Sequence, residues 1–222
     1  MQERSGVLTE HPLDIGLEEM EPDHWIAWIL AIPGCYASGT TEVEALGGVP
    51  GAWRAETGHD VPSRVRVVER WRGVPSAEDP DFIVNATFAD DRWPLDAVEI
   101  VAGIERIAGN HRRFLELVAS RDLSGEIGGI VSGIVRHLAT AEQWYFQNID
   151  QVPDGDTPDD PLERFAWIRA FSLRMLPTLA DREIRGDRGG EGWTPRKVLR
   201  RMIWHERDHT RQIAAILAAS ST

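Results

Sequence analysis

The segment PRKVLRRMIWHERDHTRQIAAILAA, residues 195–219, decides the fold of the second half of this chain. Its apolar residues and two histidines recur at intervals of three and four, which predicts one long amphipathic helix. Thr194 is expected as its N-cap, with Pro195 at the first helical position. The predicted inward stripe is Val198, Met202, His205, His209, Ile213 and Ile216. The helix therefore carries two imidazoles one turn apart on the same face.

The letters His205-Glu206-Arg207-Asp208-His209 also match the HExxH motif of zinc proteases. Those enzymes need a third ligand downstream, and one group places a glycine and a histidine where this chain has Gln212 and Ala215. Thirteen residues follow His209, and none of them is Asp, Glu or His. We therefore do not expect a protease. Glu206 is expected to be solvated or to lie outside the ligand shell, not to act as a general base.

A third imidazole lies on the helix predicted for residues 126–149. The predicted inward stripe of that helix is Ile127, Ile130, Ile134, His137, Ala141, Trp144 and Asn148. One core histidine is usually explained by a hydrogen bond, whereas three on two facing helices can meet at one metal ion. The predicted metal ligands are therefore His137, His205 and His209.

Other residues near these histidines are weaker candidates. Glu142 follows His137 by five residues, which turns it ~140° from the inward face. Asp208 is a candidate to orient a ligand or to form a surface ion pair. Trp144 and Trp204 are candidates to line a pocket, with core packing as the alternative. Four further histidines carry less information: His11, His24 and His59 lie in the first part of the chain without helical pairing, and His111 is expected to be exposed.

The sequence pattern changes near residues 88–95, from short strand-like runs separated by Gly and Pro to long helical periods. In the first part, strands are expected at 24–30, 65–71 and 82–88, with a helix beginning within 40–46. In the second part, helices are expected at 95–121, 126–149, 161–183 and 195–219, separated by loops that include 153–158 and 186–192. We therefore predict a two-domain α+β protein: an α+β domain at residues 1–92 and an up-down four-helix bundle at residues 93–222.

Composition limits the function classes. The formal net charge of −12 argues against a nucleic-acid partner and against an anionic membrane surface. The chain has one cysteine, Cys35, so no intramolecular disulfide forms, as is usual in a reducing cytosol. The first residues lack the apolar core of a signal peptide, and no apolar run approaches ~18 residues. We expect a cytoplasmic protein that acts on a small molecule, with a homodimer as an open option.

The second part resembles the DinB-like (YfiT-like) family of four-helix metalloenzymes. The resemblance rests on residues 134–145, IVRHLATAEQWY, and 204–213, WHERDHTRQI, and covers about residues 94–219. In that family one histidine late in the second helix and an HxxxH pair on the fourth hold the metal. Carried over, these are His137, His205 and His209. The resemblance implies a metal-dependent transferase, of which some use a low-molecular-weight thiol, with zinc and nickel among the plausible metals.

The first part is similar to HicB-like small α+β domains. The residues that carry this similarity are 25–28, WIAW, and 32–46, IPGCYASGTTEVEAL, and it covers about residues 5–75. HicB-like antitoxins usually carry a separate DNA-binding segment, whereas here the helical part stands in its place and the charge is acidic. We therefore infer no antitoxin role. Cys35 is expected to serve turn formation or packing and not as a nucleophile.

Three functions remain open from the sequence. The leading one is thiol-dependent transfer at a metal held by three histidines, and the alternative is metal-dependent hydrolysis by a bound water. The third is a non-catalytic ligand-sensing or interaction module with a structural metal. Three histidines leave a position open, whereas structural zinc sites are closed by four protein ligands, which favours the enzyme hypotheses.

Overall fold

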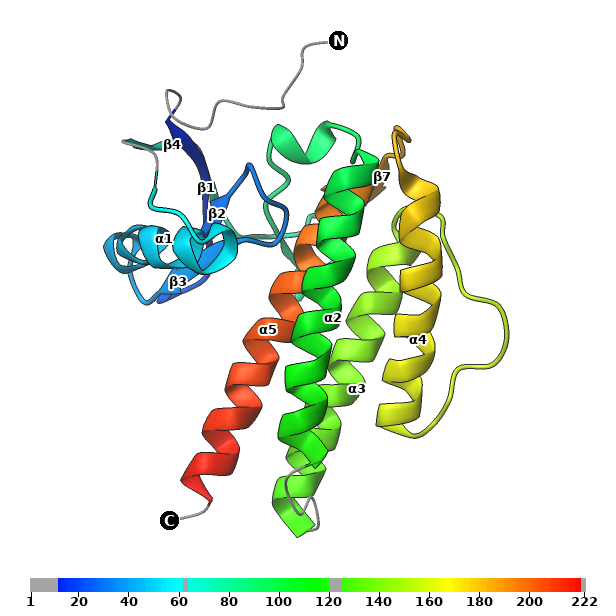
Figure 1. The fold of residues 1–222 in the computed structure, drawn as a ribbon. Coiled ribbons are helices and arrows are strands. Elements are labelled where there is room, and N and C mark those ends of the chain that lie inside the picture. The colour runs from blue at the N-terminus through cyan, green and yellow to red at the C-terminus, as the bar shows by residue number, and fades with distance from the viewer. Residues whose placement is uncertain (1–11, 62–63, 120–124, 221–222) are drawn as a thin grey trace. The chain divides into compact units, whose positions relative to one another are not determined.

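The computed structural model describes residues 12–61, 64–119 and 125–220. In these residues the chain is mixed α+β, with five α-helices and a small sheet (Figure 1). It divides into two compact units: Met1–Asp90 with Gly189–Glu191, and Asp91–Arg188 with Gly192–Thr222. The division after Asp90 lies two residues before the boundary expected from the sequence.

The first unit is built on a four-stranded sheet with the strand order β3-β2-β1-β4. β1 (Leu13–Glu21) and β2 (His24–Ile29) are antiparallel and are joined by a turn in which Asp23 has a φ of 61°. β3 (Tyr36–Gly39) is antiparallel to β2, whereas β4 (Val65–Arg72) is parallel to β1. β2 and β4 confirm the strands expected at residues 24–30 and 65–71. β3 and β1 were not expected, although β1 is an inner strand with Leu13, Ile15 and Leu17 in the core.

α1 (Glu42–Thr57) connects β3 to β4 and packs on β2 and β3. Its N-cap is Thr41, whose hydroxyl accepts the N–H of Glu44, while the Glu44 carboxylate accepts the N–H of Thr40 at 2.8 Å. These reciprocal bonds satisfy backbone donors at the helix start. Cys35 is 1% exposed in the core under this helix, which confirms the packing role expected for it.

The strand expected at residues 82–88 is wrong beyond its first residues. Only β6 (Ile83–Val84) forms, and it pairs with β5 (Val74–Pro75). Further along, the N–H of Ala86 donates to Glu18 Oε1 at 2.7 Å, and Glu18 is fully buried. A buried carboxylate therefore takes the place of a strand partner, which a local sequence pattern does not reveal.

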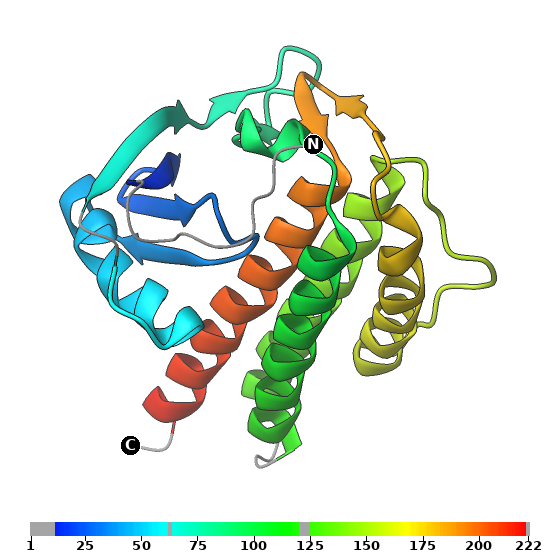
Figure 2. The ribbon, with the colours of Figure 1, turned by 45° about the horizontal axis from the view of Figure 1, so that its top comes forward.

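The second unit carries four long helices that run side by side (Figures 1 and 2). They are α2 (Ala97–Ala119), α3 (Gly125–Gln147), α4 (Pro161–Met175) and α5 (Pro195–Ala219). α5 has the predicted bounds, and Thr194 is its N-cap, accepting the N–H of Lys197 at 3.2 Å. Residues 120 and 121, which the first predicted helix included, lie outside the described residues. None of the helices in the described ranges is long and apolar enough to cross a membrane.

The helices do not alternate in direction, so the predicted up-down order is wrong. Arg136, midway along α3, donates to the carbonyl of Asp159 just before α4, and Arg169 of α4 pairs with Glu142 further along α3. α3 and α4 are therefore parallel. The thirteen residues 148–160 between them run back along α4 (Figure 1). An extended chain of that length spans up to about 43 Å, and α4 is about 22 Å long, so the crossover is easily made.

α4 ends at Met175, eight residues before the predicted end at Glu183. A 3₁₀ turn, η2 (Leu176–Leu179), follows it and contains Pro177. Proline has no backbone N–H and its ring clashes with the preceding turn, so the α-helical hydrogen-bond pattern stops there. The predicted helix was too long because the apolar period continues through Leu176 and Leu179, which are buried in the 3₁₀ turn.

A short hairpin replaces the loop expected at residues 186–192. β7 (Gly186–Arg188) and β8 (Glu191–Trp193) form a two-stranded sheet. The two residues between them, Gly189 and Gly190, have φ values of 58° and 87°. A two-residue turn with both φ values positive matches the right-handed twist of the flanking strands, and a Gly-Gly pair is typical of it.

The buried face of α3 differs from the predicted stripe. Its buried residues include Val131, Val135, Leu138, Glu142 and Tyr145, again at spacings of three and four. Ile130, in the predicted stripe, is 47% exposed, and His137 is also exposed. The true stripe contains a carboxylate, which Arg169 neutralises in the folded protein. A charged residue is not expected in a buried stripe, so the sequence favoured the neighbouring pattern, which carries no carboxylate.

Candidate metal centre

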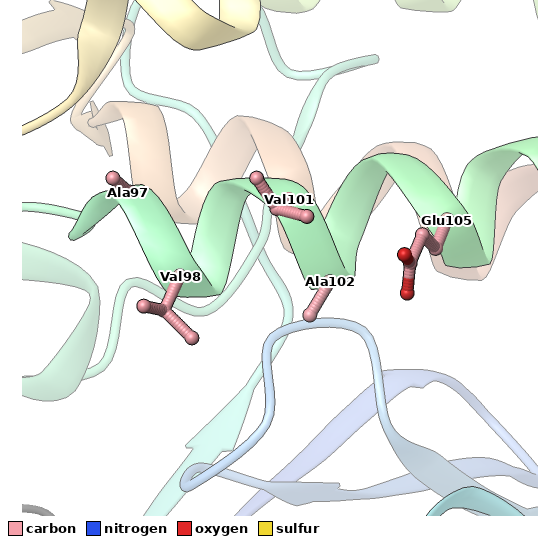
Figure 3. Close-up of a pocket in the computed structure, with 5 residues that line it drawn as sticks. All are labelled: Ala97, Val98, Val101, Ala102 and Glu105. Atoms are coloured by element: carbon pink, nitrogen blue, oxygen red, sulfur yellow. The ribbon is translucent and has the colours of Figure 1, made fainter.

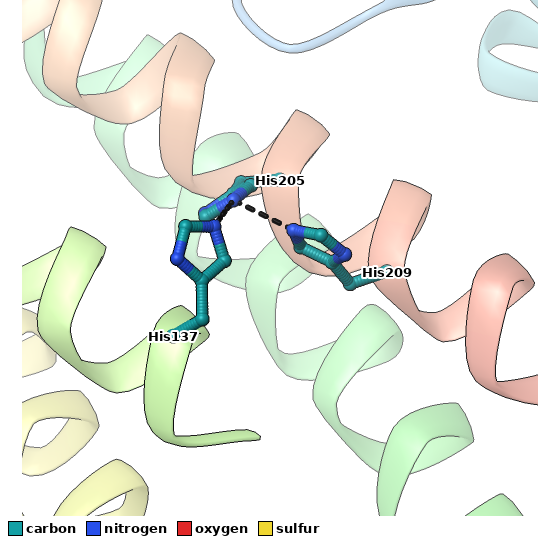
Figure 4. Close-up of side chains that lie close together, drawn as sticks. All are labelled: His137, His205 and His209. Carbon is teal, nitrogen blue, oxygen red and sulfur yellow. Dashed lines mark hydrogen bonds between the residues drawn. The ribbon is translucent and has the colours of Figure 1, made fainter. Parts of the chain in front are cut away.

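Three histidines meet between α3 and α5 (Figure 4). Nε2 of His137 lies 3.0 Å from Nε2 of His205, and Nε2 of His209 lies 2.9 Å from the same atom. The four-residue spacing on α5 brings the second pair together, and the antiparallel packing of α3 brings in the first. The ligand atoms of all three lie within 4.8 Å of one another. The structure thus places the three predicted site residues at one point.

The hydrogen bonds around the three rings fit a cation. Nδ1 of His209 lies 2.6 Å from Oε1 of Gln212, and because an amide oxygen only accepts, Nδ1 carries the proton. With the Nδ1 position taken by this hydrogen bond, Nε2 is the nitrogen of His209 that can face a metal ion. Nε2 of His205 lies between two other Nε2 atoms and can donate to only one. A zinc ion with bonds of about 2.0–2.1 Å separates its ligands by roughly 3.3 Å, close to the 3.0 and 2.9 Å that separate Nε2 of His205 from the other two Nε2 atoms.

Burial between the two helices also lowers the pKa of two of the three histidines. Burial lowers the pKa of His205 well below its ordinary value, and the charges of His209, His137 and Arg201 act in the same direction. Burial likewise lowers the pKa of His137, with a smaller contribution from His209. Both rings are therefore neutral near pH 7 and offer a lone pair without first losing a proton.

Aromatic rings surround His205 and account for its burial. Trp204 is stacked on it, with ring centroids 5.4 Å apart, and the Tyr145 ring lies at 6.0 Å. Trp193 stacks on Tyr145 at 5.1 Å, and Trp144 meets Trp193 edge-on at 5.0 Å. Trp204 thus borders the triad, as proposed from the sequence, whereas Trp144 lies one ring further away. Tyr145 was missed, although it neighbours Trp144 in the chain.

Gln212 is the residue beside the triad that sequence reasoning did not assign. It follows His209 by three residues, so it lies one turn further along the same face of α5. A hydrogen-bonding side chain at that spacing was the available signal. Asp208, the acidic candidate, is half-buried, and in the described residues it forms no hydrogen bond or ion pair with the triad.

Glu206 was expected to be solvated or to lie just outside the ligand shell, and its burial rules out the first of these two alternatives. Its side chain is 1% exposed, and its carboxylate pairs with Arg169 at 3.0 Å and lies 2.8 Å from Nδ1 of His111. His111 is correspondingly only 22% exposed and is not the free surface residue expected. Glu142 bonds to the same Arg169 and is 3% exposed, so the prediction that it turns away from the inward face of its helix is wrong. Neither carboxylate belongs to the metal-binding group.

The triad is the one group of three or more His, Cys, Asp or Glu side chains with metal-binding spacing in the part of the chain that is described. His24 begins β2, and His59 lies just beyond α1 and is exposed. His11 lies outside the described residues. Among the described residues, His24, His59 and His111 therefore belong to no comparable group.

A separate shallow pocket lies along the first turns of α2 (Figure 3). It is lined by Ala97, Val98, Val101, Ala102 and Glu105. Four of these side chains are apolar, and the fifth is a single carboxylate. With no imidazole or thiol in its lining, this pocket offers no metal chemistry.

No family model matches this chain, and no curated protein and no solved structure matches it either. Function is therefore inferred from the residues of the site and from their geometry.

Proposed function

We propose that this chain is a metal-dependent enzyme of the DinB-like (YfiT-like) family, with His137, His205 and His209 as the ligands of a divalent ion. The observation that carries the proposal is the convergence of three Nε2 atoms from two helices. Zinc and nickel are the expected metals, because imidazole suits both. Three protein ligands leave a position for a small molecule, which is the arrangement of catalytic zinc sites.

The proposed reaction is thiol-dependent transfer. When bound, the ion would lower the pKa of a low-molecular-weight thiol or of water and so supply a nucleophile near neutral pH. The protein's part is to hold the ligand atoms. Gln212 sets the tautomer of His209, and the rings of Trp204 and Tyr145 keep water from one side of His205. Hydrolysis would use the same residues but would proceed without a thiol.

The two units fit the two resemblances seen in the sequence. We propose that the first is a HicB-like α+β domain; the residues that carry the resemblance lie in β2, in β3 and at the start of α1, which supports a small α+β domain. The second would be the DinB-like four-helix bundle, with residues 134–145 on α3 and 204–213 on α5. In this reading the metal site belongs wholly to the second unit.

Elemental analysis of the purified protein tests the site. Wild-type protein supplemented with zinc or nickel is expected to hold stoichiometric metal, and a His205→Ala, His209→Ala variant is expected to hold none. His59→Ala, which removes an exposed histidine of the first unit, is the matched control and is expected to bind as wild type does. Wild-type protein without metal after supplementation would overturn the proposal. Activity that needs no added thiol would replace transfer with hydrolysis.

A further inference from the structure

A buried charged cluster joins all four helices of the second unit. It consists of Arg169 on α4, Glu142 on α3, Glu206 on α5 and His111 on α2. Arg169 donates from Nη2 to Glu142 at 2.6 Å and from Nη1 to Glu206 at 3.0 Å. The side chains of Arg169, Glu142 and Glu206 are 5%, 4% and 1% exposed. One guanidinium therefore bridges two carboxylates that water hardly reaches.

We propose that this charged cluster is a positioning device for the metal site, an inference that rests on the proposed function. Glu206 directly follows His205 on α5, and Glu142 follows His137 by five residues on α3. Arg169 therefore ties together the same two helices that carry the three ligands, within two turns of them. The cluster holds α3 and α5 in the register at which the Nε2 atoms converge.

The energetics of buried charge support a role in register. Burying three charges costs desolvation free energy that their mutual attraction offsets only in part, and apolar side chains often serve stability as well or better. A bidentate guanidinium specifies the relative position of the helices, because its two parallel N–H···O bonds form only when the helices are in one register. Sliding α5 by one turn, about 5.4 Å, would leave Glu206 and Glu142 buried without their partner. Apolar surfaces carry no such penalty.

The charged cluster therefore holds α3 and α5 in place before any metal binds. If α3 and α5 sample other registers, only a fraction of molecules has its three histidines in place, and the apparent affinity for metal falls by that fraction. A tenfold loss corresponds to a protein that is competent about one tenth of the time. Stability alone does not report this loss, because an apolar replacement can be as stable as the original.

Two variants test the proposal by zinc titration against a chelating indicator and by thermal unfolding of the metal-free protein. Glu142→Leu, Arg169→Met, Glu206→Leu replaces the three charges together, and we expect an unfolding temperature at or above that of wild type with about tenfold weaker zinc binding. Arg169→Lys keeps the charge but loses the fork, and we expect a smaller loss of zinc affinity.

The Asp91–Arg200 pair provides the matched control. It is also a bidentate ion pair made by α5, with side chains 3% and 4% exposed. Asp91→Leu, Arg200→Met is expected to leave zinc affinity unchanged. Zinc affinity equal to that of wild type in both cluster variants would overturn the positioning role and leave the proposed function standing. An equal loss of zinc affinity in the Asp91→Leu, Arg200→Met control would do the same. Wild-type protein that binds no zinc would overturn the proposed function and this inference with it.

Discussion

The Nδ1 side of the His209 ring is held by Gln212, whose Oε1 accepts from Nδ1 at 2.6 Å. Removing that acceptor with Gln212→Leu frees the ring to rotate and to change tautomer, so we expect metal affinity to fall by about tenfold. Gln212 is exposed, so its loss should change stability by no more than about 0.5 kcal/mol. Metal titration checks the affinity, with Gln147→Leu on the exposed face of α3 as control. Gln212→Glu should restore binding, and unchanged affinity in Gln212→Leu would show that Gln212 does not hold the ring.

Some residues of the site could be predicted from one short segment of sequence, and others depend on a partner far away in the chain. His137, His205 and His209 were predictable because helical spacing and motif letters lie within each segment. Glu206 was not, because its partner Arg169 lies 37 residues away and no local pattern pairs them. From the sequence alone, the Glu206 carboxylate was therefore expected to be solvated or to lie just outside the ligand shell. A buried ion pair is a property of two helices meeting, and single-helix periodicity cannot report it.

At the scale of elements, local chemistry predicted where a capped helix begins and missed long-range partners. The start of α5 was predicted because Thr194 and Pro195 are strong start signals. The predicted strand at residues 82–88 failed because Ala86 finds its acceptor in Glu18, 68 residues earlier. The direction of α4 was missed for a different reason, since a thirteen-residue linker permits either direction. The hairpin at Gly189-Gly190 could have been predicted from its Gly-Gly pair, but the segment was expected to be a loop.

Strand β1 contains a glycine, Gly16, at a position where the ring of Phe88 leaves no room for a side chain. A Cβ built on Gly16 would lie 2.7 Å from the ring of Phe88, which is 1% exposed. Gly16→Ala should therefore lower the free energy of unfolding by about 1–3 kcal/mol, as measured by urea denaturation. Gly47→Ala on α1 is the control: its Cβ meets nothing within 4 Å, and we expect a gain of about 0.5–1 kcal/mol. A Gly16→Ala protein as stable as wild type would mean that Phe88 shifts freely.

At the scale of the whole molecule, acidic groups outnumber basic ones by 36 to 24, so carboxylates dominate the titration of the chain at low pH. Model carboxylates titrate near pH 4, whereas an unperturbed histidine titrates near pH 6.5. Between about pH 5 and pH 6.5 an unperturbed histidine therefore changes its charge more than a model carboxylate does. That window covers all seven histidines, so variants are needed to assign a change in stability to the candidate metal centre.

Within that window the metal-free protein should lose stability as pH falls. Burial lowers the pKa of His205 and His137 in the folded state, so the unfolded chain binds more protons below about pH 6.5. The contribution of the two rings to stability is therefore fully present above that pH and declines toward their lower folded pKa. Thermal unfolding with chelator at pH 7.5 and at pH 5.5 measures the decline. A His137→Gln, His205→Gln variant should show a flatter profile, and His59→Gln should not. An equal decline in the double variant would assign the pH dependence to other groups.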